Sequence, residues 1–244
     1  MTDEQAWALS LVPEILWANL YHDAIIESEW LKDKTISPSG SLGMAVGYNF
    51  VYPLYRILDE MHPKNILETG LGQSTRLTAQ YAGYYKATHS VVEHDPNWAK
   101  FFLESFKGMS DYSKLYVTPL YMADHEGIPY YAYQNFEKIL NHIAYLTNVE
   151  GGYPKFDFIV IDGPFGGGKR ARRDIIAFIP QCLNDDFVIM IDDCGRPGEI
   201  HLCNQIQSIL QSNGIKFAST QYSASGINKV GIITSESKRF FASL

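Results

Sequence analysis

The sequence predicts an α/β fold with a doubly wound, seven-stranded and mostly parallel sheet, an antiparallel last strand and N-terminal helices. Strand-like apolar segments alternate with helical segments along most of the chain, which is typical of a parallel sheet covered by helices. The segments 158–161 and 188–191 are apolar on both faces, as expected of strands that are buried on both sides. A link of four residues, 223–226, joins the last two strands and is too short for a parallel crossover.

The spacing of apolar residues places each element in turn. Two helices are expected in residues 1–40, which we interpret as an N-terminal extension that forms a lid or a dimer surface. The main domain, 41–244, begins with an apolar helix near 42–61. Strands are expected at 65–69, 88–93, 114–118, 156–162, 186–192, 215–222 and 228–234, the reversed one at the sheet edge. Helices are expected near 74–85, 96–107, 132–147, 171–183 and 198–213.

The segment 119–155 is long for a crossover between strands and is rich in tyrosine. It is either a helix with an aromatic core face or an insertion that walls a substrate pocket.

Composition excludes several classes of function. The 244 residues are 46% hydrophobic and carry a formal charge of −7, which argues against a nucleic-acid partner. There is no apolar run of about 18 residues, as a spanning helix requires, and the N-terminus lacks the basic region of a signal peptide. Cys182, Cys194 and Cys203 have no framework spacing, so we expect reduced thiols in a cytoplasmic protein without a membrane partner.

The most informative motif runs from Ile66 to Thr75. Apolar residues lead into Glu68, then Gly70 and Gly72, then Ser74 at the start of a helix. Glycine lets a ligand approach the backbone closely, and the free N–H groups of a helix start suit an anionic group. Glu93 ends the next strand, about twenty residues beyond the turn, where an acid can bind a ribose diol.

The alternative for Glu93 is a solvated loop acid or a helix cap. Asp95 and Pro96 already fill the capping and first-turn positions, which favours ribose binding.

Three acids follow two neighbouring central strands: Asp162 after one, Asp192 and Asp193 after the other. Unpaired acids held together repel each other, and a divalent cation such as Mg²⁺ would relieve that repulsion. The alternative is that Asp162 caps the following turn while one of the pair faces solvent.

Basic residues concentrate after the glycines at 166–168. Lys169, Arg170 and Arg173 could bind an anionic substrate, and the alternative is a solvated helix start paired with nearby acids. Arg196 lies on the loop after the acidic pair, where it either touches substrate or pairs with Glu199.

These motifs together resemble the class I S-adenosylmethionine-dependent methyltransferases over residues 40–234. Residues 68–74 match the first motif of that class and residues 92–96 match its ribose-binding acid. The acids Asp162, Asp192 and Asp193 resemble the metal triad of the catechol and macrolide-sugar O-methyltransferases. The stretch 39–43 resembles the region that closes over the cofactor in that group. The residues 163–168 depart from the catechol type, which leaves the metal and a catalytic lysine open.

The resemblance implies methylation of a small-molecule or glycan hydroxyl, with S-adenosylmethionine as cofactor and Mg²⁺ as a further candidate. It implies a cofactor site at Glu68, Gly70, Gly72, Ser74, Glu93 and Asp162. Asp162, His94 and Lys169 are the candidate catalytic residues, and a homodimer is a further expectation.

Three other functions compete. An aminopropyl transferase of the spermidine-synthase type shares the fold but needs paired acids for its amine. A nicotinamide-dependent oxidoreductase needs a third glycine where Thr75 stands. A methyltransferase-like fold kept as a binding module is the non-enzymatic alternative.

Overall fold

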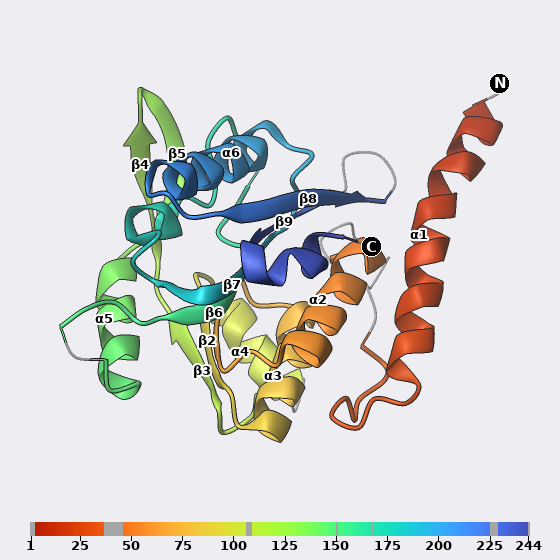
Figure 1. Cartoon of the computed structure of the whole chain (residues 1–244), viewed down its shortest axis with the longest axis horizontal. Coiled ribbons are helices and arrows are strands. Elements are labelled where there is room, and N and C mark those ends of the chain that lie inside the picture. The colour runs from red at the N-terminus through yellow and green to blue at the C-terminus, as the bar shows by residue number, and fades with distance from the viewer. Residues whose placement is uncertain are drawn as a thin grey trace.

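A seven-stranded sheet forms the centre of the computed structural model, which describes residues 3–36, 46–105, 109–149, 151–166, 168–224 and 229–243, with side chains from residue 13 (Figure 1). The strands of this sheet are β1 (Asn65–Thr69), β2 (Thr88–Glu93), β3 (Ser113–Val117), β6 (Phe156–Ile161), β7 (Leu183–Ile191), β8 (Phe217–Ser223) and β9 (Lys229–Ser235). The helices are α1 (Asp3–Ile25), α2 (Tyr48–Met61), α3 (Gln73–Tyr85), α4 (Pro96–Ser105), α5 (Phe136–Leu146) and α6 (Pro197–Ser212).

The order of the strands is β3-β2-β1-β6-β7-β9-β8, and β9 pairs antiparallel with both of its neighbours, β7 and β8. The predicted seven-stranded, mostly parallel sheet is therefore confirmed. The expectation of a reversed strand at the edge is wrong, because β9 lies between β7 and β8 and pairs with both. The chain moves outward from β1 to β3 and then returns to β6 beside β1, so the order reverses between β1 and β6. Ligands of open α/β sheets bind at the carboxyl ends of the strands at such a point.

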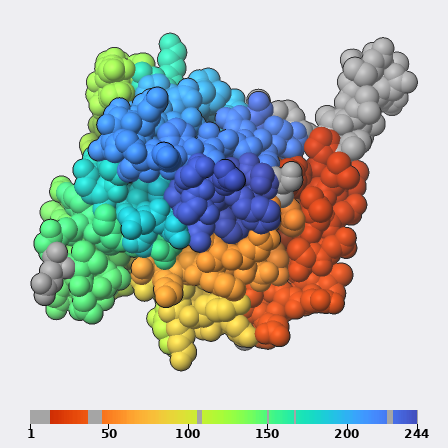
Figure 2. Space-filling model, in the orientation of Figure 1, coloured from red at the N-terminus to blue at the C-terminus, as the bar shows by residue number. Residues whose placement is uncertain are grey.

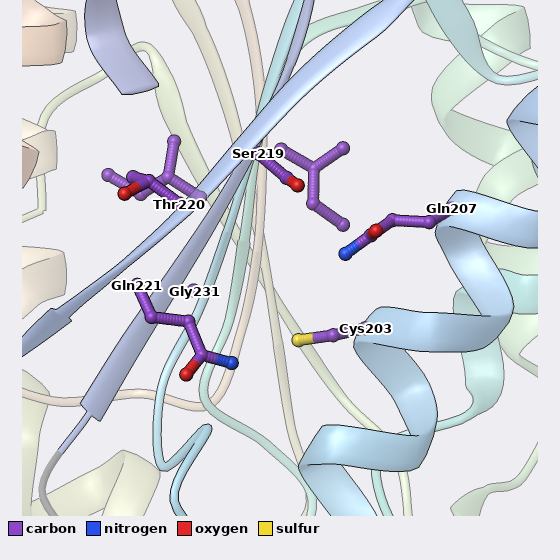
Figure 3. A pocket seen from close by; sticks show the side chains of 8 residues that line it. Cys203, Gln207, Ser219, Thr220, Gln221 and Gly231 are labelled. Carbon is purple, nitrogen blue, oxygen red and sulfur yellow. The ribbon is translucent and has the colours of Figure 1, made fainter. Parts of the chain in front are cut away.

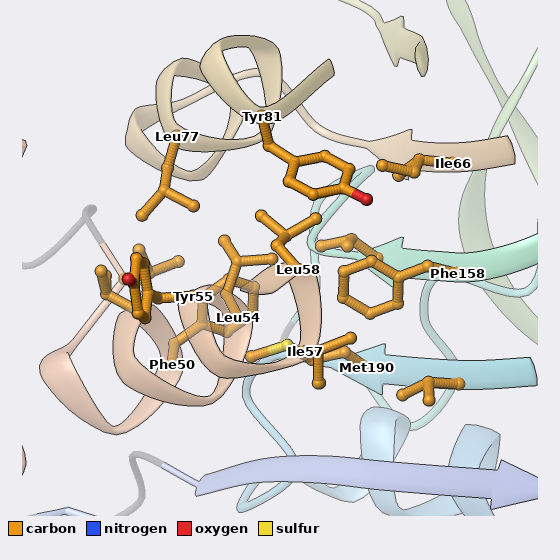
Figure 4. Close-up of a cluster of buried hydrophobic side chains, with 14 of the residues drawn as sticks. Phe50, Leu54, Tyr55, Ile57, Leu58, Ile66, Leu77, Tyr81, Phe158 and Met190 are labelled. Carbon is orange, nitrogen blue, oxygen red and sulfur yellow. The ribbon is translucent and has the colours of Figure 1, made fainter. Parts of the chain in front are cut away.

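Helices cover both faces of the sheet. On one face, α2 and α3 pack on β1, β6 and β7, and Figure 4 shows Phe50, Leu54 and Leu58 of α2 beside Phe158 of β6. On the other face, α5 and α6 pack on the same strands through side chains such as Leu140. This burial on both faces explains why β6 and β7 are apolar on both sides.

The N-terminal segment is one long helix, α1, where the sequence predicts two. Trp30, Leu31 and Ile36, which follow α1, are buried in the same core as α2. The indole N–H of Trp30 donates to Oδ1 of Asp59 at 2.7 Å. Figure 2 shows this segment lying along α2. The expected boundary near residue 40 and the stretch 39–43 lie outside the described residues.

One other expectation about local structure is wrong. The helix near 171–183 is absent, and only a short 3₁₀ helix, Asp174–Phe178, forms before β7. Pro180 has no N–H to donate and therefore interrupts helical hydrogen bonding there. In the segment 119–155, a two-stranded hairpin of β4 (Leu120–His125) and β5 (Ile128–Tyr133) precedes α5. Gly127 adopts φ +76° at its turn.

No helix among the described residues is long and apolar enough to cross a bilayer.

Candidate functional site

The glycine turn leaves β1 at the point where the strand order reverses. Gly70 has φ +92°, and a Cβ there would lie 3.0 Å from the backbone of Asp162 and Gly163. Glycine is therefore required at position 70 both by conformation and by the close approach of the two loops. A Cβ on Gly72, in contrast, would meet no atom within 4 Å. The space beside Gly72 is open.

Glu68 stabilises this turn through hydrogen bonds to the start of α3. Its Oε1 accepts hydrogen bonds from the hydroxyls of Ser74 at 2.6 Å and Thr75 at 3.0 Å. Its Oε2 lies 3.0 Å from Nε2 of His89. The side chains of Glu68 and His89 are fully buried. Glu68 and Ser74, both predicted to bind cofactor, therefore shape the turn through contacts with each other.

Glu93 joins the end of β2 to the glycine turn. Its Oε2 accepts the N–H of Leu71 at 2.9 Å, and its Oε1 accepts the N–H groups of His94 and Asp95 at 2.7 and 2.8 Å. Burial alone would raise the pKa of Glu93, but these hydrogen bonds and the adjacent His94 ring outweigh it, so the pKa is lowered. Glu93 is therefore an ionised acid held against the turn.

The three predicted metal ligands do come together. One carboxylate oxygen each of Asp162, Asp192 and Asp193 lies within 4.8 Å of the other two. Burial and mutual repulsion raise the pKa of Asp162 well above its usual range and raise that of Asp192 to about 6. The three carboxylates therefore cannot all ionise at little cost unless a cation lies beside them.

The structure supplies that cation from a residue that the sequence analysis missed. Arg172 has φ +52°, and its side chain is only 5% exposed. Its Nη2 lies 2.9 Å from Oδ2 of Asp193 and 3.3 Å from Oδ1 of Asp162. Burial alone would lower the pKa of Arg172, but these acids outweigh it and raise the pKa. Nothing in the sequence pattern distinguishes Arg172 from the basic residues on either side of it.

The predicted substrate-binding cations are mostly paired within the protein. Arg170 donates to Glu126 at 3.0 Å, and Arg196 lies 2.7 Å from Oδ2 of Asp193. Arg173 donates to Gln205 and lies over the ring of Tyr130. Arg196 forms its ion pair with Asp193 and not with Glu199, the alternative partner that the sequence suggested. Lys169 lies exposed on the loop.

His94, a candidate base, lies beside Glu93 with its Nδ1 2.8 Å from Oε1 of that residue. Its ring meets Phe165 edge to face, with the ring centroids 4.4 Å apart. Phe165 is 58% exposed and also contacts Tyr131 of β5. The hairpin β4–β5 therefore brings an aromatic side chain to the loop that follows Asp162.

A separate pocket of about 230 Å³ lies between α6 and the strands β8 and β9. Figure 3 shows Cys203 and Gln207 of α6 facing it across from Ser219. Its lining within the described residues includes none of the predicted site residues. The carboxyl ends of β1, β2, β6 and β7 therefore remain the candidate site.

No family model matches the chain, and no curated protein matches it. Solved structures do resemble it along nearly the whole length. An O-methyltransferase of tomaymycin synthesis from Streptomyces achromogenes, in complex with S-adenosylmethionine, is 12% identical over 96% of this chain and 99% of its own, with a TM-score of 0.52.

A methyltransferase from Podospora anserina bound to S-adenosylhomocysteine is 17% identical over 97% of both chains, with a TM-score of 0.51. An O-methyltransferase from Bacillus cereus, also with S-adenosylhomocysteine, is 14% identical over 92% of this chain and 91% of its own, with a TM-score of 0.50. The chain therefore has the fold of the class I methyltransferases.

Proposed function

We propose that the chain is an S-adenosylmethionine-dependent methyltransferase that acts on a hydroxyl oxygen of a small-molecule or sugar acceptor. One observation carries the proposal. The glycine turn, Glu93 and Asp162 meet at the carboxyl ends of β1, β2 and β6, where the strand order reverses. The similarity to O-methyltransferase structures supports the choice of fold and, through it, this interpretation.

The residues present fit an adenosine-bearing cofactor. The open space beside Gly72 leaves room for a ligand against the backbone. A carboxylate has about four lone-pair sites, so Glu93, which accepts three backbone N–H groups, can still accept from a ribose hydroxyl. Glu93, Gly70, Gly72 and Asp162 would hold the cofactor, while Glu68 and Ser74 keep the turn in shape.

S-adenosylmethionine, when bound, supplies an activated methyl group. The task of the protein is then to position the acceptor oxygen in line and to accept its proton. Asp162 keeps 27% of its side chain exposed at the tip of β6, and burial together with the neighbouring Asp192 raises its pKa, which makes its ionised carboxylate a stronger proton acceptor than an ordinary one. His94, oriented by Glu93, is the second candidate base. No contact of the described residues joins the amine of Lys169 to Asp162, so its catalytic role rests on the sequence alone.

The acidic cluster does not fit a Mg²⁺ ion as it stands, because the guanidinium of Arg172 lies between Asp162 and Asp193.

An anionic acceptor is a further part of the proposal. Lys169 has an exposed amine, and Arg170 and Arg173 lie on the same loop. Because these two arginines already have protein partners, an anion would have to displace Glu126 or Gln205 to bind them. We further propose a cytoplasmic enzyme, since its three cysteines are free thiols. We also propose a homodimer formed through the N-terminal helix α1.

Calorimetric titration with S-adenosylmethionine, S-adenosylhomocysteine and NAD tests the proposal. We expect binding of the first two and none of NAD. Absence of both adenosyl ligands would overturn the proposal. Transfer of a labelled methyl group to a panel of hydroxyl and amine acceptors then tests O-methylation. Asp162→Asn should lower the transfer rate strongly, while Asp185→Asn, at an exposed position of β7, serves as the matched control.

A further inference from the structure

The acidic cluster at the ends of β6 and β7 contains a cation of its own. Arg172 reaches it from the loop between β6 and the 3₁₀ helix Asp174–Phe178. All three nitrogens of its guanidinium have partners. Nη2 bridges Asp193 and Asp162, Nη1 donates to the carbonyl of Asp192 at 3.1 Å, and Nε donates to the carbonyl of Pro164 at 3.3 Å.

A fourth acid lies behind the same guanidinium. Glu199 of α6 is fully buried, and Nε of Arg172 lies 3.7 Å from its Oε1. Neither carboxylate oxygen of Glu199 has a hydrogen-bond partner among the described residues. The loop that follows β6 packs closely against Glu199, because a Cβ on Gly166 would lie 2.0 Å from its Oε1. Arg172 therefore lies beside the carboxylates of Asp162, Asp193 and Glu199 with only 5% of its own side chain exposed.

Among the described residues, Arg172 occupies the side of the cluster where a divalent ion would contact both Asp162 and Asp193. Mg²⁺ needs oxygen ligands, from carboxylates and water, at about 2.0–2.1 Å in near-octahedral geometry. Oδ2 of Asp193 is shared by Arg172 at 2.9 Å and Arg196 at 2.7 Å, so its lone pairs are already used. Nη2 of Arg172 stands between that oxygen and Asp162, and a metal there would meet a guanidinium that stays charged at any ordinary pH.

A guanidinium also suits the cluster better than other cations would. Its flat fork presents several N–H groups in fixed directions, so one side chain can bind carboxylate and carbonyl oxygens at once. By binding Oδ1 of Asp162 it fixes the direction of that carboxylate at the tip of β6. A lysine amine at the same place could neutralise charge, but it could not reproduce these separate contacts.

We propose that Arg172 is the resident cation of this cluster and that the protein at rest takes up no divalent metal there. It follows that removal of Arg172 converts the four acids into a divalent-cation site. This inference concerns the charge balance of the fold and does not depend on methyl transfer, so its test needs no active enzyme.

The test is a titration of the full chain with Mn²⁺, followed by electron paramagnetic resonance and by thermal unfolding. Wild type should show no saturable Mn²⁺ site and no rise in Tm with Mn²⁺. Arg172→Met should bind one Mn²⁺ saturably over the concentration range in which wild type shows no site, and added Mn²⁺ should raise its Tm. Arg172→Gln keeps polar contacts and serves the same purpose if the Met variant does not fold.

The matched control is Arg196→Met, which removes the outer, more exposed cation but leaves Arg172 in place. It should bind no Mn²⁺. The proposal is overturned if wild type binds one Mn²⁺ that Asp162→Asn abolishes, or if the folded Arg172 variant gains no site. Titration of wild type with S-adenosylmethionine in parallel separates a failure of this inference from a failure of the proposed function.

Discussion

Asp174 makes the folded protein less stable as the pH rises from acidic to neutral. Its Oδ1 accepts the N–H of Tyr133 at 2.7 Å, which ties the start of the 3₁₀ helix to β5. Its Oδ2 has no hydrogen-bond partner among the described residues. Burial raises the pKa of Asp174 from 3.8 to about 7, because the buried site disfavours the charged form.

The sign follows from the proton count. Between pH 4 and 7 the folded protein holds a proton on Asp174 that the unfolded chain has lost, so stability falls as pH rises through this range and the full cost is reached above pH 7. The difference between 3.8 and about 7 corresponds to about 4 kcal/mol. About 2.5 kcal/mol of this is expected to develop between pH 5 and pH 8. The side chain in Asp174→Asn cannot ionise, so the variant should not lose this stability as the pH rises.

The assay is urea unfolding of wild type and Asp174→Asn at pH 5 and at pH 8. The variant should gain about 2.5 kcal/mol relative to wild type between the two pH values, whatever other groups titrate in both proteins. Asp186→Asn is the control: the Ser237 hydroxyl lowers the pKa of Asp186, so its contribution changes only below about pH 4. An equal pH dependence in wild type and Asp174→Asn would refute the reasoning.

Four further predictions concern single contacts. Glu93→Gln should weaken S-adenosylmethionine binding about tenfold, because a neutral acceptor replaces a charged one; unchanged calorimetric affinity would exclude the ribose role. Gly70→Ala should destabilise the fold by about 1–3 kcal/mol in urea, since φ +92° is strained for alanine, and a neutral effect would contradict the close approach. Phe158→Ala should cost about 3–5 kcal/mol by leaving a cavity in a buried core; less than 1 kcal/mol would contradict that packing. Arg170→Ala should raise the KM of an anionic acceptor severalfold and leave that of a neutral one unchanged, and equal effects on both would argue against anion recognition.

The sequence by itself determined the parts of the protein that local patterns control. Apolar runs placed β6 and β7 to within a few residues, because strands buried on both faces need side chains that are apolar on both faces. The turn after β1 could also be predicted from the sequence, since the φ of +92° at Gly70 excludes almost every residue other than glycine. The short link before β9 required an antiparallel pair.

Tertiary structure decided what depends on contacts between distant segments. The position of β9 between β7 and β8 follows from pairing across the sheet, which the hairpin alone leaves open. The hairpin β4–β5 is largely exposed and so carries little of the apolar alternation that marks a strand. Above all, Arg172 has the same local sequence character as Arg173, and only the folding of its loop onto β6 and β7 buries it among the acids. Burial places a guanidinium inside the row of carboxylates that suggested a metal.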